Sequence, residues 1–178
     1  GLFKCWKKGN VGIINALGTG VADDKAVYSY VNKMIVYYLG EQPKLNQVET
    51  FLCENKVHRQ HVIENIAKLV VKPANASGGY GIMIGPKAPK KEREEMVKKI
   101  KKNPREFVAQ PLEILSTIPT ICENGIEPRH LDLRPFILTG KTSYVTTGGL
   151  TRVALRKGST IVNSSQGGGS KDTMVVDA

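Results

Sequence analysis

The stretch LVVKPANASGGYGIMIG, residues 69–85, decides the fold that the sequence predicts. Its apolar ends predict two β-strands, and Pro73 ends the first because proline has no backbone N–H to donate. The residues between them are small and rich in glycine, which adopts positive φ angles and lets a ligand approach the backbone. Lys72 lies beside this loop and provides a point charge for a phosphate. The pattern fits a phosphate-binding hairpin and also a plain glycine-rich hairpin with a surface lysine.

Composition and charge narrow the classes of protein to which the chain can belong. There is no run of about 18 apolar residues, so we expect no membrane partner. Cys5, Cys53 and Cys122 are widely spaced and form no CxxC pair, which indicates a reducing, cytoplasmic location and no structural zinc. The net charge of +10 is typical of nucleic-acid-binding proteins. Half of this excess lies in residues 90–105, with eight Lys/Arg and three Glu; we interpret that segment as a solvated helix face and expect no nucleic-acid partner.

Apolar residues recur at helical spacing in the first part of the chain. They predict an amphipathic helix from Asp24 to about Leu39, capped by Asp23. Lys25 lies in its first turn, where the positive end of the helix dipole disfavours a cation. With two glycines just upstream, this lysine fits an anion site or an exposed position without a function. Residues 11–15 predict a short buried strand.

The middle of the chain predicts a compact layer. After the two strands that flank the glycine loop, Pro89 suits the first turn of a basic helix, and Pro104 ends it. A third strand follows at residues 106–110. Upstream of the layer, residues 50–53 predict a further strand and residues 57–67 a helix.

The C-terminal third predicts antiparallel strands. Charged and apolar residues alternate over 129–138, which is typical of a half-buried strand. Its His130, Asp132 and Arg134 share one face and fit either a structural ion pair or a face that binds substrate and phosphate.

Short strands are predicted at residues 144–147, 150–156 and 159–163. Arg152 in this meander is a candidate phosphate contact or a simple surface charge. The glycine- and serine-rich segment 164–173 fits a flexible linker or a second anion-binding loop.

These elements together predict an α+β (α/β) fold, with a small β-β-α-β lobe and a larger, mainly antiparallel lobe. We expect three parts: an N-terminal strand and helix part at residues 1–67, the glycine-loop lobe at 68–111, and the antiparallel lobe at 112–178.

Five ordered segments resemble a known family. They read NALGTGVADDKA (15–26), VVKPANASGGYG (70–81), FVAQP (107–111), DLRPF (132–136) and GGLTRVALRKGSTIVNSSQGGGSKDT (148–173). They are similar to the C-terminal half of circularly permuted ATP-grasp proteins of the glutathionylspermidine synthase-like group. The resemblance implies one incomplete ATP-grasp domain, and it implies ATP-dependent joining of a carboxylate to an amine through an acyl phosphate, with small-molecule or peptide substrates.

The resemblance also implies roles for individual residues. Lys25 and Lys72 would contact the phosphates of ATP. Gln110 would begin the hinge strand beside the adenine, and Glu113 would lie near the ribose. Arg152 and Arg134 would have catalytic roles, with Arg152 holding the transferred phosphate. The glycine loop that closes over the phosphates would consist of Ser77, Gly78, Gly79, Tyr80 and Gly81.

The sequence departs from the family's pattern in the ligands of the metal. ATP-grasp catalysis uses Mg²⁺, and in the permuted family its carboxylate and asparagine ligands lie mainly before the segment present here. Asp132 and Asn163 are possible substitutes. We therefore expect a missing N-terminal half of the same protein as a partner, and no activity from the chain alone. The alternatives are a nucleotide-binding module without catalysis and a basic nucleic-acid-binding domain.

Overall fold

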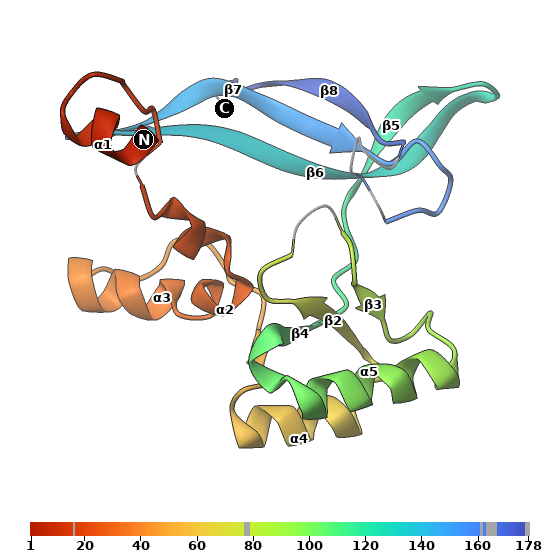
Figure 1. Ribbon diagram of the computed structural model, residues 1–178. Coiled ribbons are helices and arrows are strands. Elements are labelled where there is room, and N and C mark those ends of the chain that lie inside the picture. Colours follow the sequence, from red (N-terminus) through yellow and green to blue (C-terminus); the bar gives the residue numbers. More distant parts are fainter. Residues whose placement is uncertain (16, 77–78, 161, 163–166, 177–178) are drawn as a thin grey trace. The chain divides into compact units, whose positions relative to one another are not determined.

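The computed structural model describes residues 1–15, 17–76, 79–160, 162 and 167–176. It consists of two units, Gly1–Leu112 and Glu113–Ala178 (Figure 1). The first unit combines helices with a small sheet, and the second is built from strands. This mixture confirms the predicted α+β class. Among the described residues, no helix is long and apolar enough to cross a membrane.

The first unit contains a four-stranded antiparallel sheet. Its strand order is β1-β4-β2-β3. The strands are β1 (Phe51–Leu52), β2 (Leu69–Pro73), β3 (Met83–Ile84) and β4 (Phe107–Pro111). β2 and β4 occupy the two inner positions, and five residue pairs from Leu69↔Pro111 to Pro73↔Phe107 align them. The predicted order of strand, strand, helix and strand is confirmed.

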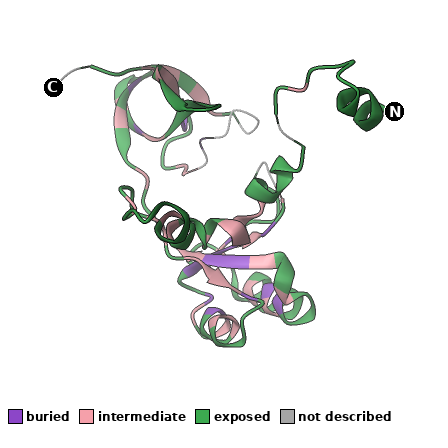
Figure 2. Ribbon diagram, turned by 90° about the vertical axis from the view of Figure 1, so that its left-hand side faces the viewer, coloured by how far each residue is buried: buried purple, intermediate pink, exposed green. Residues whose placement is uncertain are grey.

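Two helices cover one side of this sheet (Figure 1). They are α4 (Lys56–Glu64) and α5 (Lys90–Lys102), and Pro104–Glu106 form the short 3₁₀ helix η3 that leads into β4. Figure 2 shows buried positions where the helices meet the strands. The buried cluster there consists of Cys53, Val62, Ile66, Leu69, Val71, Met83, Met96, Ile100 and Ala109. α5 contributes Met96 and Ile100, which are four residues apart and therefore lie on one face.

Close packing fixes the chain where it leaves β3, the second strand of the β2–β3 hairpin. A Cβ atom placed on Gly85 would lie 2.0 Å from the carbonyl oxygen of Ile66 and 2.6 Å from that of Leu69. Gly85 N also donates a hydrogen bond to Leu69 O at 2.9 Å. Glycine is therefore required where the chain leaves β3.

The N-terminal part differs from the prediction. Instead of one helix from Asp24 to Leu39, it forms α2 (Lys25–Tyr28), α3 (Val31–Met34) and the π-helix η2 (Ile35–Leu39). The predicted apolar stripe is largely exposed, with Tyr38 76% accessible. Because helices depend on packing of an apolar face for their stability, a stripe without a covering partner among the described residues does not hold one straight helix.

Two further N-terminal predictions are wrong. Residues 11–15 form no strand, and Ile14 is fully exposed because nothing in the described part of the chain packs on it. The N-cap of α2 is Asp24 and not Asp23, which belongs to the 3₁₀ helix η1 (Thr19–Asp23). A short helix, α1 (Leu2–Lys7), precedes these elements.

The second unit is an antiparallel meander in the order β5-β6-β7-β8. Its strands are β5 (Thr117–Cys122), β6 (Gly125–Thr139), β7 (Ser143–Val153) and β8 (Gly169–Met174). The separate strands predicted at 144–147 and 150–156 join into β7, and residues 159, 160 and 162 form no strand. Residues 169–173 of the proposed linker lie in β8, because their backbone pairs with β7 from Gly149↔Thr173 to Val153↔Gly169. The glycine- and serine-rich composition of this segment did not indicate a strand.

The core of the first unit gives a stability prediction. Ile100→Ala should lower the free energy of unfolding by about 2–5 kcal/mol, because a fully buried side chain is lost and a cavity is left. The exposed neighbour on the same helix, Lys99→Ala, should change it by about 0.5 kcal/mol or less. Urea unfolding followed by circular dichroism measures both. Equal effects of the two variants would show that α5 does not pack as described.

Candidate functional site

Lys72 lies on an inner strand and is held by a chain of side-chain hydrogen bonds. Its Nζ donates to Gln110 Oε1 at 2.6 Å, across the β2–β4 pair. Gln110 Nε2 donates to Thr50 Oγ1 at 2.8 Å, and Thr50 Oγ1 donates to Val48 O at 3.0 Å. The amide of Gln110 suits this position because it has both an acceptor and a donor. The ammonium group is therefore fixed by neutral partners.

Lys25 comes to the same region from a different element. It is the first residue of α2, and its backbone N donates to Ala74 O at 2.8 Å, just after β2. Its Nζ donates to the carbonyl of Ala76 at the start of the glycine loop. The unfavourable place of Lys25 at a helix start is thus explained: the side chain turns away from the helix and reaches the loop.

The two lysines influence each other electrostatically. The pKa of Lys72 is lowered below its ordinary value, first by burial and second by the positive charge of Lys25. Among the described residues, no carboxylate forms an ion pair with either ammonium group. The charge of Lys25 also interacts with that of the adjacent Asp24. Since neither ammonium group has a direct ion pair among the described residues, an anion bound here would relieve the repulsion between the two cations.

A hollow of about 340 Å³ lies beside these groups. Its lining consists of Asp23, Lys25, Pro73, Asn75, Ala76, Gly79, Tyr80 and Ile82. Of the predicted loop, Gly79 and Gly81 have φ angles of 81° and 72°, which L side chains rarely adopt. Tyr80 is exposed, and Ser77 and Gly78 lie outside the described residues. The structure therefore brings Lys25, the described loop residues and the strand that carries Lys72 to one place.

Asp24 and Arg105 fasten α2 to the sheet, and reasoning from the sequence did not find this pair. One oxygen of Asp24 accepts a hydrogen bond from Ala26 N at 2.8 Å, and the other accepts from Arg105 at 2.6 Å. The hydrogen bond from Arg105, followed by that from Ala26 N, lowers the pKa of Asp24. Arg105 also lies 3.7 Å from Glu54. No sequence signal distinguished Arg105 from the other seven cations of its segment.

The second unit contains the predicted catalytic arginines. Arg152 Nε donates to Asp132 Oδ1 at 2.8 Å, and a second donor of Arg152 contacts the other oxygen, because the two residues are direct partners across β6 and β7. This hydrogen-bonded ion pair lowers the pKa of Asp132. Arg134 is exposed, and its positive charge also favours the ionised form of Asp132.

The remaining predicted residues belong to the second unit or lie outside the described residues. Glu113 is exposed and begins the second unit, and Asn163 lies outside the described residues. Both oxygens of Asp132 accept from Arg152. In the described part of the chain, no three His, Cys, Asp or Glu side chains gather where they could hold a metal ion. The described residues therefore supply no ready cluster of three such ligands for Mg²⁺.

The Asp24–Arg105 contact predicts a dependence of stability on pH. Asp24→Asn keeps an oxygen to cap α2 but loses the negative charge. Since the folded pKa of Asp24 lies below its ordinary value of 3.8, the ion pair stabilises the protein above that pH and is lost as the pH falls further. Near neutral pH the variant should unfold more easily by about 0.5–1 kcal/mol, and the difference should vanish in strong acid.

Urea unfolding at both pH values measures this difference. Asp23→Asn is the matched control, because Asp23 is exposed and forms no ion pair with another described residue. A loss of stability that is equal in neutral and acid solution would show that the charge of Asp24 is not responsible.

Comparisons with known proteins show the family of the chain. The model of the family described as circularly permuted ATP-grasp type 2 matches residues 1–154. An uncharacterized protein of Synechocystis is 54% identical over 177 residues, which are 99% of this chain and 37% of that protein. An uncharacterized protein of Mycobacterium tuberculosis is 51% identical, again over 99% of this chain and 32% of its own length.

A protein of Frankia casuarinae with the provisional name glutamate–cysteine ligase 2-2 is 48% identical over 98% of this chain and 20% of its own length. The chain thus spans between a fifth and somewhat more than a third of the length of these three relatives. The chain belongs to the circularly permuted ATP-grasp type 2 family.

Proposed function

We propose that this chain supplies the triphosphate-binding part of an ATP-dependent ligase that joins a carboxylate to an amine. The observation that carries the proposal is the pair Lys25 and Lys72: the charge of Lys25 acts on Lys72, and neither ammonium group forms an ion pair with a carboxylate of the described residues. A triphosphate has the negative charge that such a pair lacks. The glycine loop beside them allows phosphate oxygens to approach backbone N–H groups.

The proposed reaction has two steps. A carboxylate oxygen of the first substrate attacks the γ-phosphorus of ATP, and ADP leaves with the electrons of the broken bond. The amine of the second substrate, as the free base, then attacks the carbonyl carbon of the acyl phosphate. The bond from that carbon to the phosphate oxygen breaks, and the inorganic phosphate that leaves takes up the proton that the nitrogen loses as the amide forms. Phosphoryl transfer requires positioning and charge stabilisation more than covalent participation of the protein.

The chain's own residues would act on the phosphates in this scheme. Lys72, held by Gln110, would offer a preorganised cation that costs little reorganisation when charge develops. Lys25 would exchange its bond to Ala76 O for a phosphate oxygen. Arg152 and Arg134 would contact the transferred phosphate or the acyl phosphate, and for this Arg152 must share its donors with Asp132.

The metal is proposed to depend on another part of the protein. Mg²⁺ prefers oxygen ligands and in such sites neutralises the phosphates. The described residues offer no group of ligands for it, and Asp132 is engaged by Arg152. We therefore propose that its carboxylates come from a segment of the longer protein, and that this chain alone binds nucleotide without turnover. The name of the Frankia relative contains glutamate and cysteine, and these two amino acids are one candidate pair of substrates.

The proposal predicts the effect of removing one ammonium group. Lys72→Met keeps the apolar stem but removes the charge, and it should weaken binding of ADP or ATP at least about tenfold, because charge-assisted hydrogen bonds to phosphate contribute about 1.5–3 kcal/mol. Lys25→Met should weaken binding in the same direction. Isothermal titration calorimetry in magnesium-free buffer measures both affinities.

Lys87→Met is the matched control, since Lys87 is an exposed lysine of the same unit that does not line the hollow. It should bind nucleotide as the unchanged protein does. If all three variants lose affinity equally, binding follows net charge and the proposed site is wrong. ADP release by the unchanged chain at a steady rate would contradict the proposed need for a second segment, and binding without turnover also fits the alternative of a nucleotide-binding module.

A further inference from the structure

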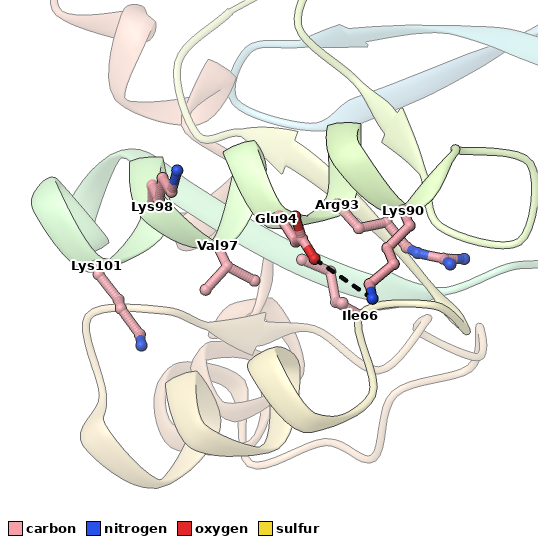
Figure 3. Close-up of a pocket in the computed structure, with 7 residues that line it drawn as sticks. All are labelled: Ile66, Lys90, Arg93, Glu94, Val97, Lys98 and Lys101. Carbon is pink, nitrogen blue, oxygen red and sulfur yellow. Dashed lines mark ion pairs between the residues drawn. The ribbon is translucent and has the colours of Figure 1, made fainter.

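The first unit has a second hollow, of about 460 Å³, which shares no residue with the lysine site. Figure 3 shows its lining along α5. The lining consists of Ile66, Lys90, Arg93, Glu94, Val97, Lys98 and Lys101. Six of these belong to α5 and recur at three- and four-residue spacing from Lys90 to Lys101, so they form one continuous stripe of the helix.

The floor of this groove is apolar. Val97 packs against the buried cluster of the unit, and Ile66 is itself a member of that cluster. The aliphatic stems of the lysines extend this apolar surface, since long cationic side chains place methylene groups along a protein and their charges in water. The groove therefore offers more than a row of solvated charges.

The rim of the groove is strongly cationic. The lining contains one anion, Glu94, and four cations, which are Lys90, Arg93, Lys98 and Lys101. Glu94 is 3.9 Å from Lys90, and its charge is thereby already matched. Arg93 donates to the carbonyl of Gly85 at 3.3 Å, which fixes this side chain at one end of the groove. In Figure 3 the Lys90 and Lys101 side chains leave the helix on the same side as Val97.

We propose that this groove binds an acidic peptide segment with an apolar side chain at its centre. Carboxylates would contact the cations at both ends, and the apolar side chain would cover Ile66 and Val97. The α5 stripe is about 16 Å long, from eleven steps of about 1.5 Å each. An extended peptide rises about 3.3 Å per residue, so about five residues span it.

Charge complementarity and the apolar floor favour a peptide over a nucleic acid. Single-stranded nucleic acids bind through aromatic side chains on which bases stack, together with cations along the backbone. The residues that line the groove include no aromatic side chain. A peptide supplies carboxylates and an apolar side chain together, and both kinds of surface in the groove are then used.

The experiment uses the full chain and a synthetic nine-residue peptide of eight glutamates around a central leucine. Fluorescence anisotropy measures its affinity, and nuclear magnetic resonance shift changes locate it on the protein. Lys98→Glu with Lys101→Glu should weaken binding at least about tenfold, because close charge pairs are replaced by repulsion. The peptide with serine in place of leucine should bind several-fold more weakly, since the floor is then uncovered.

Lys99→Glu with Lys102→Glu is the matched control. It makes the same change of net charge in the same turns of α5 and meets the same helix dipole, but neither residue lines the groove. Its affinity should stay within about twofold, since exposed charges outside the site are screened by salt. Equal loss in both double variants, or a nine-nucleotide uridine oligomer that binds the groove more tightly than the peptide, would overturn the proposal. Thermal unfolding of each variant verifies that it is folded. If the double glutamate variant of the groove does not fold, Lys98→Gln with Lys101→Gln replaces it. The glutamine variant should weaken binding less than the glutamate variant does.

Discussion

A partly desolvated ammonium group without a counter-ion is the constraint on which the first unit depends. Lys72 is placed on an inner strand, where burial lowers its pKa and Lys25 lowers it further. A protein stabilises such a group cheaply with a carboxylate, and here the described residues use neutral oxygen instead. The unit thereby contains a cationic centre that no carboxylate of the described residues neutralises through an ion pair.

The surroundings of this centre are fixed from several elements. α2 is tied to the chain after β2 by Lys25 N, and to the segment before β4 by the contact between Asp24 and Arg105. Ala74 N donates to Glu106 O at 2.8 Å, so the exit of β2 is held from the same side. The glycine loop, in which Gly79 and Gly81 have positive φ angles, comes shortly after Ala74 in the chain. Rigid support next to a permissive loop is what a preorganised anion site requires.

Much of the first unit follows from local rules that the sequence displays. The prolines at 73, 89 and 104 and the glycine-rich loop predicted β2, β3, α5 and β4 correctly, because each acts on its own neighbours. The long helix after Asp24 failed for the opposite reason: its apolar stripe predicts a straight helix only if another surface covers it. β8 was concealed because its glycine and serine composition is that of a linker, and only pairing with β7 makes it a strand.

The candidate site could be predicted in the same uneven way. Lys72 and the glycine loop are candidates from their positions in the sequence, whereas Lys25 fits an anion site or an exposed position without a function, and only the resemblance to the family assigns it to the phosphates. Arg105 was not identified, because a lysine- and arginine-rich segment hides the one cation that has a partner far away in sequence. The metal-ligand role expected of Asp132 stays a prediction, and the register of β6 and β7 pairs this residue with Arg152. Register is a property of two strands together, and neither strand alone displays it.

The hydrogen bond between Gln110 and Lys72 has a consequence for how position 110 can vary. Glutamate has nearly the same shape as glutamine, and its carboxylate would hold the lysine at least as firmly. It would also cancel the positive charge, and it would reverse the bond with Thr50, so that Val48 O loses its donor. The exchange of one nitrogen for one oxygen thus decides whether the charge of Lys72 is balanced within the strand pair.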